Sequence, residues 1–240
     1  MKLQSAIRVL YPPQCLVCGV DASVDFALCA DCWREMPFVT GLVCDICGTP
    51  LPGEDTGEPA QCDSCLMAPK PWVRGRAALL YDGTARRMVL ALKHGDRQDL
   101  VRPMARWMAN QTRLLAKDAP LLAPVPLHRT RLFTRRFNQS ALLTKTLAGM
   151  CDLNWCPDLI TRLRATRLQE GMTREERHEN QRQAFKVPDN RKALILDRSV
   201  LLIDDVMTSG ATLSACTEAC YAAGAASVTV QVLARVARNT

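Results

Sequence analysis

The sequence predicts an α/β fold, a parallel sheet with helices on both faces, preceded by a small cysteine-rich module. Three observations predict it. Four Cys-x-x-Cys pairs lie before residue 66. After residue 72, apolar runs of strand length alternate with segments of helical periodicity. Near the end, one apolar run leads directly into two aspartates and a loop of small residues. We therefore divide the chain into residues 1–70 and residues 71–240.

The cysteine pairs indicate metal binding. Two thiolates two residues apart chelate one tetrahedral ion, and two such pairs complete a closed structural zinc site. Sequential pairing leaves spacers of 10 and 14 residues and is favoured, although an interleaved arrangement is also possible. Disulfides are the alternative, but no secretory signal indicates an oxidising compartment. The expected ligands of two zinc ions are Cys15, Cys18, Cys29, Cys32, Cys44, Cys47, Cys62 and Cys65.

The cysteine-rich module is too short to bury a large core, so metal ligation is expected to supply its folding energy. Residues 1–70 hold 4 basic and 9 acidic side chains, which argues against direct binding of nucleic acid. We expect a structural or protein-contact role, an exposed tip at residues 53–60, and a boundary near Pro69 and Pro71. The other cysteines, Cys151, Cys156, Cys216 and Cys220, are expected to be small buried side chains.

The second part reads as alternating strands and helices. Strands are expected at 73–81, 121–126, 158–163, 184–187, 199–204 and 227–236, and helices at 84–94, 99–117, 139–150 and 212–223, with Asn138 as an N-cap and Gly224 as a terminator. This alternation predicts a parallel sheet whose ligand site lies at the carboxyl ends of its strands. Residues 73–118 and the cysteine module are expected to form a hood over an acceptor pocket. The polar stretch 164–182 is either a lid over the site or a charged surface hairpin.

Residues 200–212 carry the strongest functional signal. The apolar run 200–203 predicts a strand buried on both faces, and Asp204 and Asp205 follow it directly. The small residues 208–212 then open a helix, where backbone N–H groups converge on an anion. One turn thus combines an anion cradle with two acids that can hold hydroxyls or a metal. The alternative is an ordinary turn in which the aspartates only cap the helix.

This segment resembles the phosphoribosyl-pyrophosphate (PRPP) motif of type I phosphoribosyltransferases, with Ala211 where a second glycine is commoner. The resemblance implies a phosphoribosyltransferase-like sheet, PRPP bound with Mg²⁺, and Asp204 and Asp205 as the catalytic acids that hold the ribose hydroxyls. It also implies that the strand after residue 120 leads into a pyrophosphate loop. The implied PRPP-binding residues are Asp204, Asp205, Val206, Met207, Thr208, Ser209, Gly210, Ala211 and Thr212, and the pyrophosphate-loop candidates are Arg129, Arg131, Arg135 and Arg136.

Further motifs narrow the resemblance to the ComF/GntX family, whose members join a zinc ribbon to a phosphoribosyltransferase-like domain. These motifs are Lys93-His94-Gly95-Asp96, Val125-Pro126-Leu127, Arg135-Arg136-Phe137-Asn138-Gln139, and Gln169 with Arg177 and Asn180. Arg136 departs from the family pattern, which usually has glycine there. The resemblance implies a transferase acting on an unknown acceptor in DNA uptake or utilisation. The alternative is a non-catalytic module that binds single-stranded DNA or a DNA-processing protein in competence, and a transcription factor is the least favoured interpretation.

The charge and hydropathy of the sequence limit the kinds of partner that the protein can have. Residues 71–240 carry 27 basic and 15 acidic side chains, so an anionic ligand should meet this part of the chain. Aromatic residues make up 5% of the sequence, which leaves few platforms on which bases could stack. The chain lacks an apolar run of about 18 residues, so no membrane span is expected. The start of the chain does not resemble a signal peptide, and a cytoplasmic location is expected.

Overall fold

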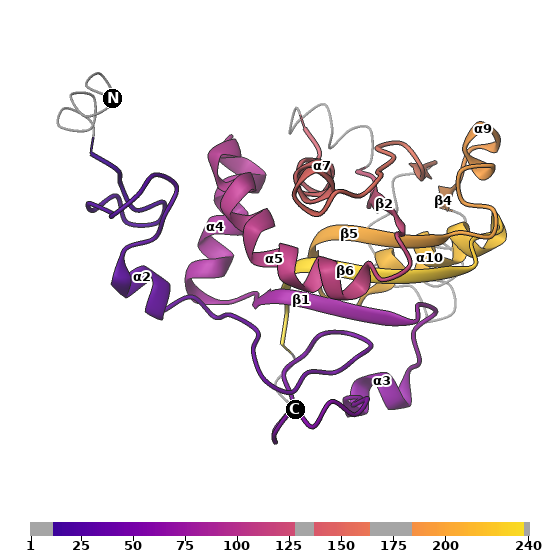
Figure 1. Cartoon of the computed structure of the whole chain (residues 1–240), viewed down its shortest axis with the longest axis horizontal. Helices are drawn as coiled ribbons and strands as arrows, with labels where there is room; N and C mark the ends of the chain where they lie inside the picture. The colour runs from indigo at the N-terminus through magenta and orange to yellow at the C-terminus, as the bar shows by residue number, and fades with distance from the viewer. Residues whose placement is uncertain (1–11, 128–136, 164–183, 238–240) are drawn as a thin grey trace, which may run out of the picture.

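The central feature of the computed structural model, which describes residues 12–127, 137–163 and 184–237, is a four-stranded sheet. Its strand order is β1-β6-β5-β2, and each pair of neighbours is parallel (Figure 1). The strands are β1 (Arg74–Leu80), β2 (Leu121–Pro124), β5 (Ser199–Met207) and β6 (Ser227–Arg235). The parallel sheet predicted from the alternation of strands and helices is therefore confirmed.

Helices cover both faces of this sheet, as predicted. They are α4 (Gly83–His94), α5 (Val101–Leu115), which follows the short 3-10 helix η1 (Gln98–Leu100), α7 (Gln139–Cys151) and α10 (Ala211–Ala222). Side chains of β5 alternate between the two cores, because successive residues of a strand point to opposite faces. Val200 and Leu202 pack with α10, whereas Leu201 and Ile203 pack with α4, α5 and α7.

Two of the predicted strands do not belong to the parallel sheet. Within residues 158–163 the structure forms only β3 (Thr161–Arg162), which pairs antiparallel with β4 (Phe185–Lys186). A short helix, α9 (Asp189–Lys192), follows β4. The residues next to these short strands, Ile160 and Ala184, and Phe185 of β4 are nevertheless buried in the core that includes α10. The prediction that these strands continue the βαβ alternation was wrong.

The cysteine-rich module forms two lobes that lie on different sides of the sheet (Figure 1). The first ribbon, residues 12–35, contains α2 (Ala30–Arg34) and packs Leu16, Val17 and Leu28 against the core that includes α4 and α5. The second ribbon, residues 42–68, contains α3 (Asp63–Met67) and contributes to the opposite core, which includes α10. The tip at residues 52–59 is exposed, as predicted.

Both edges of the sheet are covered by irregular chain. Along β1, the segment between the two ribbons makes backbone hydrogen bonds from Val39 N–H to Ala78 (3.0 Å) and from Leu80 N–H to Pro37 (2.8 Å). Along β2, the backbone N–H of Leu122 bonds to Asn154 at 2.9 Å. Of the expected hood at residues 73–118, β1 is itself a strand of the sheet, and α4 and α5 pack on the sheet's face.

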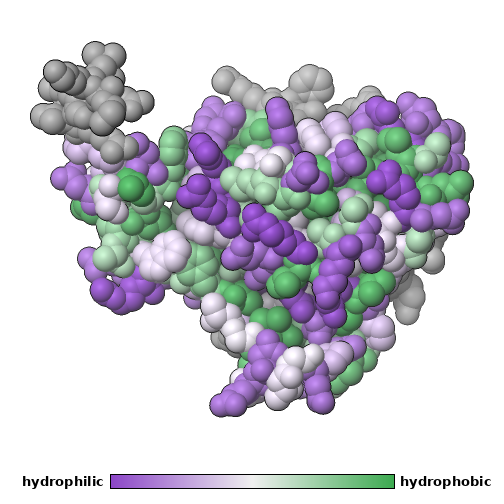
Figure 2. All heavy atoms as spheres, viewed as in Figure 1, coloured by the Kyte–Doolittle hydropathy of each residue, from purple (hydrophilic) through white to green (hydrophobic). Residues whose placement is uncertain are grey.

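Surface hydropathy is mixed on the face drawn in Figure 2, where apolar side chains also appear on the first ribbon. The exposed apolar residues of that ribbon are Val20, Val24, Phe26 and Trp33. None of the helices within the described ranges combines the length and the apolar character that crossing a membrane requires. The proposed lid at 164–182 and the N-terminal segment 1–11 lie outside the described residues.

Candidate functional site

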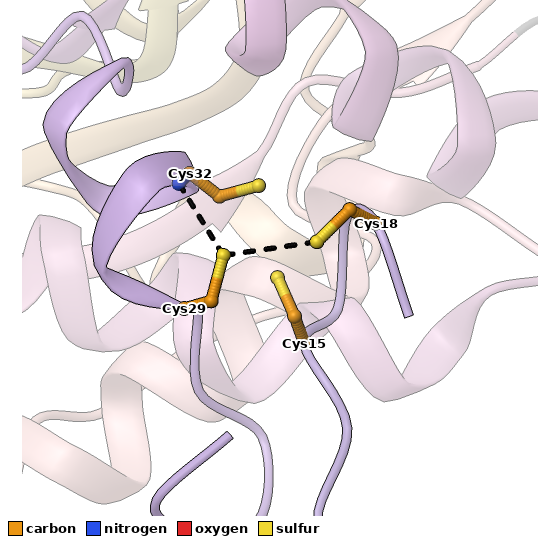
Figure 3. Close-up of side chains that lie close together, drawn as sticks. All are labelled: Cys15, Cys18, Cys29 and Cys32. Atoms are coloured by element: carbon orange, nitrogen blue, oxygen red, sulfur yellow. Dashed lines mark hydrogen bonds between the residues drawn. The ribbon is translucent and has the colours of Figure 1, made fainter. Parts of the chain in front are cut away.

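The first zinc centre brings Cys15 and Cys18 of one knuckle against Cys29 and Cys32 at the start of α2 (Figure 3). The knuckle is closed by a 3.0 Å hydrogen bond from Gly19 N–H to the Cys15 carbonyl, and Gly19 has a φ of 76°. Cys29 is the N-cap of α2, so the helix start aims both of its cysteines at the knuckle.

The second centre repeats this arrangement with Cys44 and Cys47 on a knuckle and Cys62 and Cys65 at the start of α3. Three of its four cysteines are at most 3% exposed, so this centre is more deeply buried than the first. The predicted sequential pairing of knuckles is thus confirmed in both ribbons.

Both donor sets fit zinc. All four sulfurs of each centre lie within 4.8 Å of one another, and the Sγ atoms of Cys18 and Cys29, and of Cys47 and Cys62, are each 3.7 Å apart. A tetrahedral zinc with bonds of about 2.3 Å to sulfur requires sulfurs about 3.8 Å apart. Four thiolates in this geometry form a closed structural site with no open position for a substrate.

The two aspartates lie within β5, near its carboxyl end, and do not cap α10. Gly210 occupies the N-cap position of α10, with a φ of 80° and no side-chain capping bond. Since consecutive residues of a strand face opposite ways, Asp204 and Asp205 have different surroundings. The capping alternative considered for these two residues is therefore excluded.

Asp204 is held by α7. Its Oδ1 accepts hydrogen bonds from Ser140 Oγ at 2.8 Å and from the backbone N–H of Asp205 at 2.9 Å. Asn138 fixes the start of α7, because its side chain accepts from Ser140 N–H and donates to the Val125 carbonyl, both at 3.0 Å. This confirms the predicted N-cap and explains how Ser140 reaches the end of β5.

Burial raises the pKa of Asp204 to about 7, and the charge of Asp205 adds to this effect. The two hydrogen bonds that the carboxylate accepts oppose the shift but do not cancel it. A carboxyl group with a pKa near neutrality inside a hollow is typical of functional sites.

Asp205 is 8% exposed and forms an ion pair with Lys93, whose Nζ lies 2.8 Å from its Oδ1. Lys93 stands near the carboxyl end of α4. The sequence motif at residues 93–96 contributed to the family resemblance, but no local pattern indicated that its lysine meets the second aspartate. Ser140 was missed for the same reason, since only the folded chain brings it to β5.

A hollow of about 190 Å³ opens at this end of the sheet. It is lined by Asp204 and by residues 206–213, which include all the predicted PRPP-binding residues except Asp205. Thr208 and Ser209 are exposed, whereas Gly210 is buried. The four predicted pyrophosphate-loop arginines, Arg129, Arg131, Arg135 and Arg136, lie outside the described residues, as do Gln169, Arg177 and Asn180.

The remaining cysteines are free. Cys156, Cys216 and Cys220 are buried, as predicted, and Cys151 is partly buried. Burial raises the pKa of Cys220 to about 12, and a protonated thiol of this kind acts as a small apolar side chain.

Comparison with known families defines the class of this protein. A double zinc ribbon domain matches residues 6–66, and a phosphoribosyl transferase domain matches residues 153–240. The second match contains β5, α10 and the hollow between them. The chain is thus a zinc-ribbon protein with a phosphoribosyltransferase-type domain, as its motifs predicted.

Relatives of similar length identify the particular family. The chain is 30% identical to the DNA utilization protein YhgH of Salmonella typhimurium, over 93% of this chain and 97% of the relative. It is 27% identical to YhgH of Escherichia coli K12 with the same coverage, and 26% identical to competence protein F of Haemophilus influenzae over 87% of this chain and 90% of the relative. The chain belongs to the family of these DNA utilization and competence proteins.

Proposed function

We propose that this protein binds PRPP at the carboxyl end of β5 and transfers its phosphoribosyl group to an acceptor. The observation that carries the proposal is the hollow lined by Asp204 and by residues 206–213. Its loop, Thr208–Thr212, leads into the 12-residue helix α10, whose N-terminus favours the 5-phosphate of PRPP. The hydroxyls of Thr208, Ser209 and Thr212 would add hydrogen bonds to the same phosphate.

Asp204 would accept hydrogen bonds from the ribose hydroxyls. When the bond between C1 and the pyrophosphate oxygen breaks, the electron pair leaves with pyrophosphate and positive charge develops on the ribose. The carboxylate would stabilise that charge until a nucleophile of the acceptor bonds to C1 and loses its proton. Asp204 would also hold Mg²⁺ bound with PRPP, and the ion would supply charge compensation for the leaving pyrophosphate.

Asp205 and Lys93 would serve the same site differently. Because Asp205 is buried in an ion pair with Lys93, it contributes a fixed charge beside Asp204 and helps to set the pKa of that residue. Arg129, Arg131, Arg135 and Arg136 are the candidates to neutralise the departing pyrophosphate, since arginine holds a polyanion through several N–H groups.

Titration calorimetry of zinc-loaded protein with PRPP, with and without Mg²⁺, tests the proposal. We expect Mg²⁺-dependent binding that weakens at least about tenfold in Asp204→Asn. Asp197→Asn is the matched control, because Asp197 is an exposed aspartate before the amino end of β5. Absence of binding in the folded, zinc-replete protein, or equal loss in both variants, would refute the assignment.

A second function is favoured by the names of the relatives, which refer to DNA utilization and competence. In that case the basic second part would hold single-stranded DNA, or the apolar surface of the first ribbon would contact a DNA-processing protein. Retention of an oligonucleotide that falls steeply with salt would support direct DNA binding. We place either function in the cytoplasm, where zinc-binding thiolates stay reduced.

A further inference from the structure

The second ribbon contacts residues 207–212, called here the phosphate loop after the ligand proposed for it, through Trp72. This residue is 3% exposed, and its indole Nε1–H donates a 2.6 Å hydrogen bond to the carbonyl of Ile46, which lies between the zinc ligands Cys44 and Cys47. The other end of the ring packs on Gly210, where an added Cβ would be 2.9 Å from Trp72 Cη2. One rigid side chain therefore spans from the zinc knuckle to the left-handed residue of the loop.

Arg235, at the end of β6, makes a second connection. It is 7% exposed, and its Nη1 donates to the carbonyls of Met207 and Val236, each at 3.1 Å, and to the carbonyl of Thr208. By bonding to these carbonyls, Arg235 holds the backbone in place where β5 ends and the loop begins. Within the described part of the chain, Arg235 Nε is buried without a hydrogen-bond partner, and no carboxylate forms an ion pair with this arginine.

The buried charge of Arg235 needs a counter-charge nearby. The charge of Arg235 interacts with the side chain of Cys47 in the second centre. Four thiolates around one Zn²⁺ carry a net charge of about −2. The second zinc centre is thus a negative group that interacts with this arginine.

The knuckle also fits closely against the sheet. Gly75 N–H donates a 2.7 Å hydrogen bond to the Asp45 carbonyl, and an added Cβ on Gly75 would be 2.2 Å from the Ile46 carbonyl oxygen. An added Cβ on Gly48 would be 2.6 Å from the backbone nitrogen of Ala77. There is no room for the knuckle to shift without moving β1, which pairs with the strand that carries Arg235.

The first zinc centre has a different setting. Its ribbon packs on the opposite core, beside α4 and α5. Its polar contacts there include Arg97 Nη2 with the Leu16 carbonyl at 3.4 Å. The two centres match in ligands and local geometry but differ in what they support.

From these contacts we infer that the second zinc centre positions the phosphate loop, with Trp72 and Arg235 as the positioning residues, and that the first centre does not. Zinc bound at the second centre orders residues 207–212, and loss of that zinc releases them. This inference deepens the proposed function. It rests on the proposed function only for the identity of the ligand that the loop holds.

Cys62→Ser and Cys29→Ser form a matched pair for the test. Each replaces a partly buried cysteine at the N-cap of a short helix, and each should remove one of the two zinc ions. Hydrogen exchange of residues 207–212 is measured in the ligand-free proteins, together with zinc content. We expect at least about tenfold faster exchange in Cys62→Ser and little change in Cys29→Ser. Equal exchange in the two variants, whether raised or unchanged, overturns the inference.

If Cys62→Ser does not fold, Trp72→Leu and Arg235→Lys test the same inference in proteins that keep all their zinc ligands. Trp33→Leu on the first ribbon is their control. We expect both to keep two zinc ions and to speed exchange at 207–212, while exchange within β5 at 200–203 stays slow. Unchanged loop exchange in both would overturn the inference.

PRPP calorimetry on the same proteins separates the two proposals. An unmodified protein that does not bind PRPP, with the exchange difference intact, refutes the proposed ligand and leaves the positioning role standing. Equal PRPP affinity in Cys62→Ser and the unmodified protein refutes the positioning role.

Discussion

Replacing Asp204 by asparagine removes one negative charge from the end of β5 and keeps the shape of the side chain. The oxygen of asparagine can still accept from Ser140 Oγ and from the backbone N–H of Asp205, the two bonds made at 2.8 and 2.9 Å in the unmodified protein. The substitution therefore changes charge with little change in packing. We expect it to stabilise the fold and to weaken PRPP binding at least about tenfold.

The size of this gain follows from the pKa of Asp204, which burial first and Asp205 second raise from 3.8 to about 7. A raised folded-state pKa means that unfolding releases the proton, so the ionised aspartate costs stability as the pH rises from about 4 to about 7. A shift of this size corresponds to about 4 kcal/mol for a fully buried group. Because the side chain is partly exposed, we expect Asp204→Asn to gain about 2 kcal/mol above pH 7.

Urea unfolding of the zinc-loaded proteins at several pH values between 5.5 and 8.5 measures the difference. The gain should grow as the pH rises towards 7 and level off above it, while Asp197→Asn should match the unmodified protein throughout. Zinc release at the acidic end affects all three proteins alike and cancels in the comparison. A variant that is less stable at pH 8, or a difference independent of pH, would refute the reasoning.

Three further predictions concern the loop, the ion pair and the metal. Gly210→Ala should destabilise the protein by about 1–3 kcal/mol, measured by urea unfolding, and should weaken PRPP binding, because φ is 80° and the new methyl would meet the Trp72 ring. The control Gly149→Ala, which lies in open space on α7, should instead stabilise the protein by about 0.5–1 kcal/mol. Lys93→Met should lower the free energy of unfolding by about 3 kcal/mol, because it leaves Asp205 buried and unpaired. Adding Asp205→Asn to that variant should recover most of the lost stability. Equal stability of the single and double variants would count against the ion pair. Stepwise thiol modification should release zinc in two phases, the first from the more exposed first ribbon, as followed with a chromogenic chelator; a single phase would contradict the difference in burial.

Local patterns made much of this structure predictable. The zinc ligands could be assigned from spacing, because a Cys-x-x-Cys knuckle closes within a few residues and its geometry depends little on the rest of the fold. The strand that carries Asp204 and Asp205 was predictable because a run buried on both faces has a distinctive composition. Strands were also expected at 158–163 and 184–187, but the antiparallel pairing of β3 with β4 was not predictable, since a two-residue strand shows no periodicity.

The supporting residues of the site could not be predicted. Lys93 and Ser140 meet the aspartates only through the packing of α4 and α7 on the sheet, and neither residue type is distinctive where it stands. Trp72 was concealed for another reason. The prolines at positions 69 and 71 suggested only a domain boundary, whereas the folded chain places this tryptophan between the knuckle and the loop.

The covering of β1 by residues 37–39 has a consequence for any attempt to study the second part alone. An uncovered edge strand offers a row of free N–H and carbonyl groups on which another chain can add a strand. A fragment of residues 71–240 would expose the β1 edge and the apolar faces on which the ribbons pack. We expect such a fragment to self-associate. The cysteine-rich module would thus have a second role besides binding metal, because it covers the β1 edge and keeps the sheet from self-association.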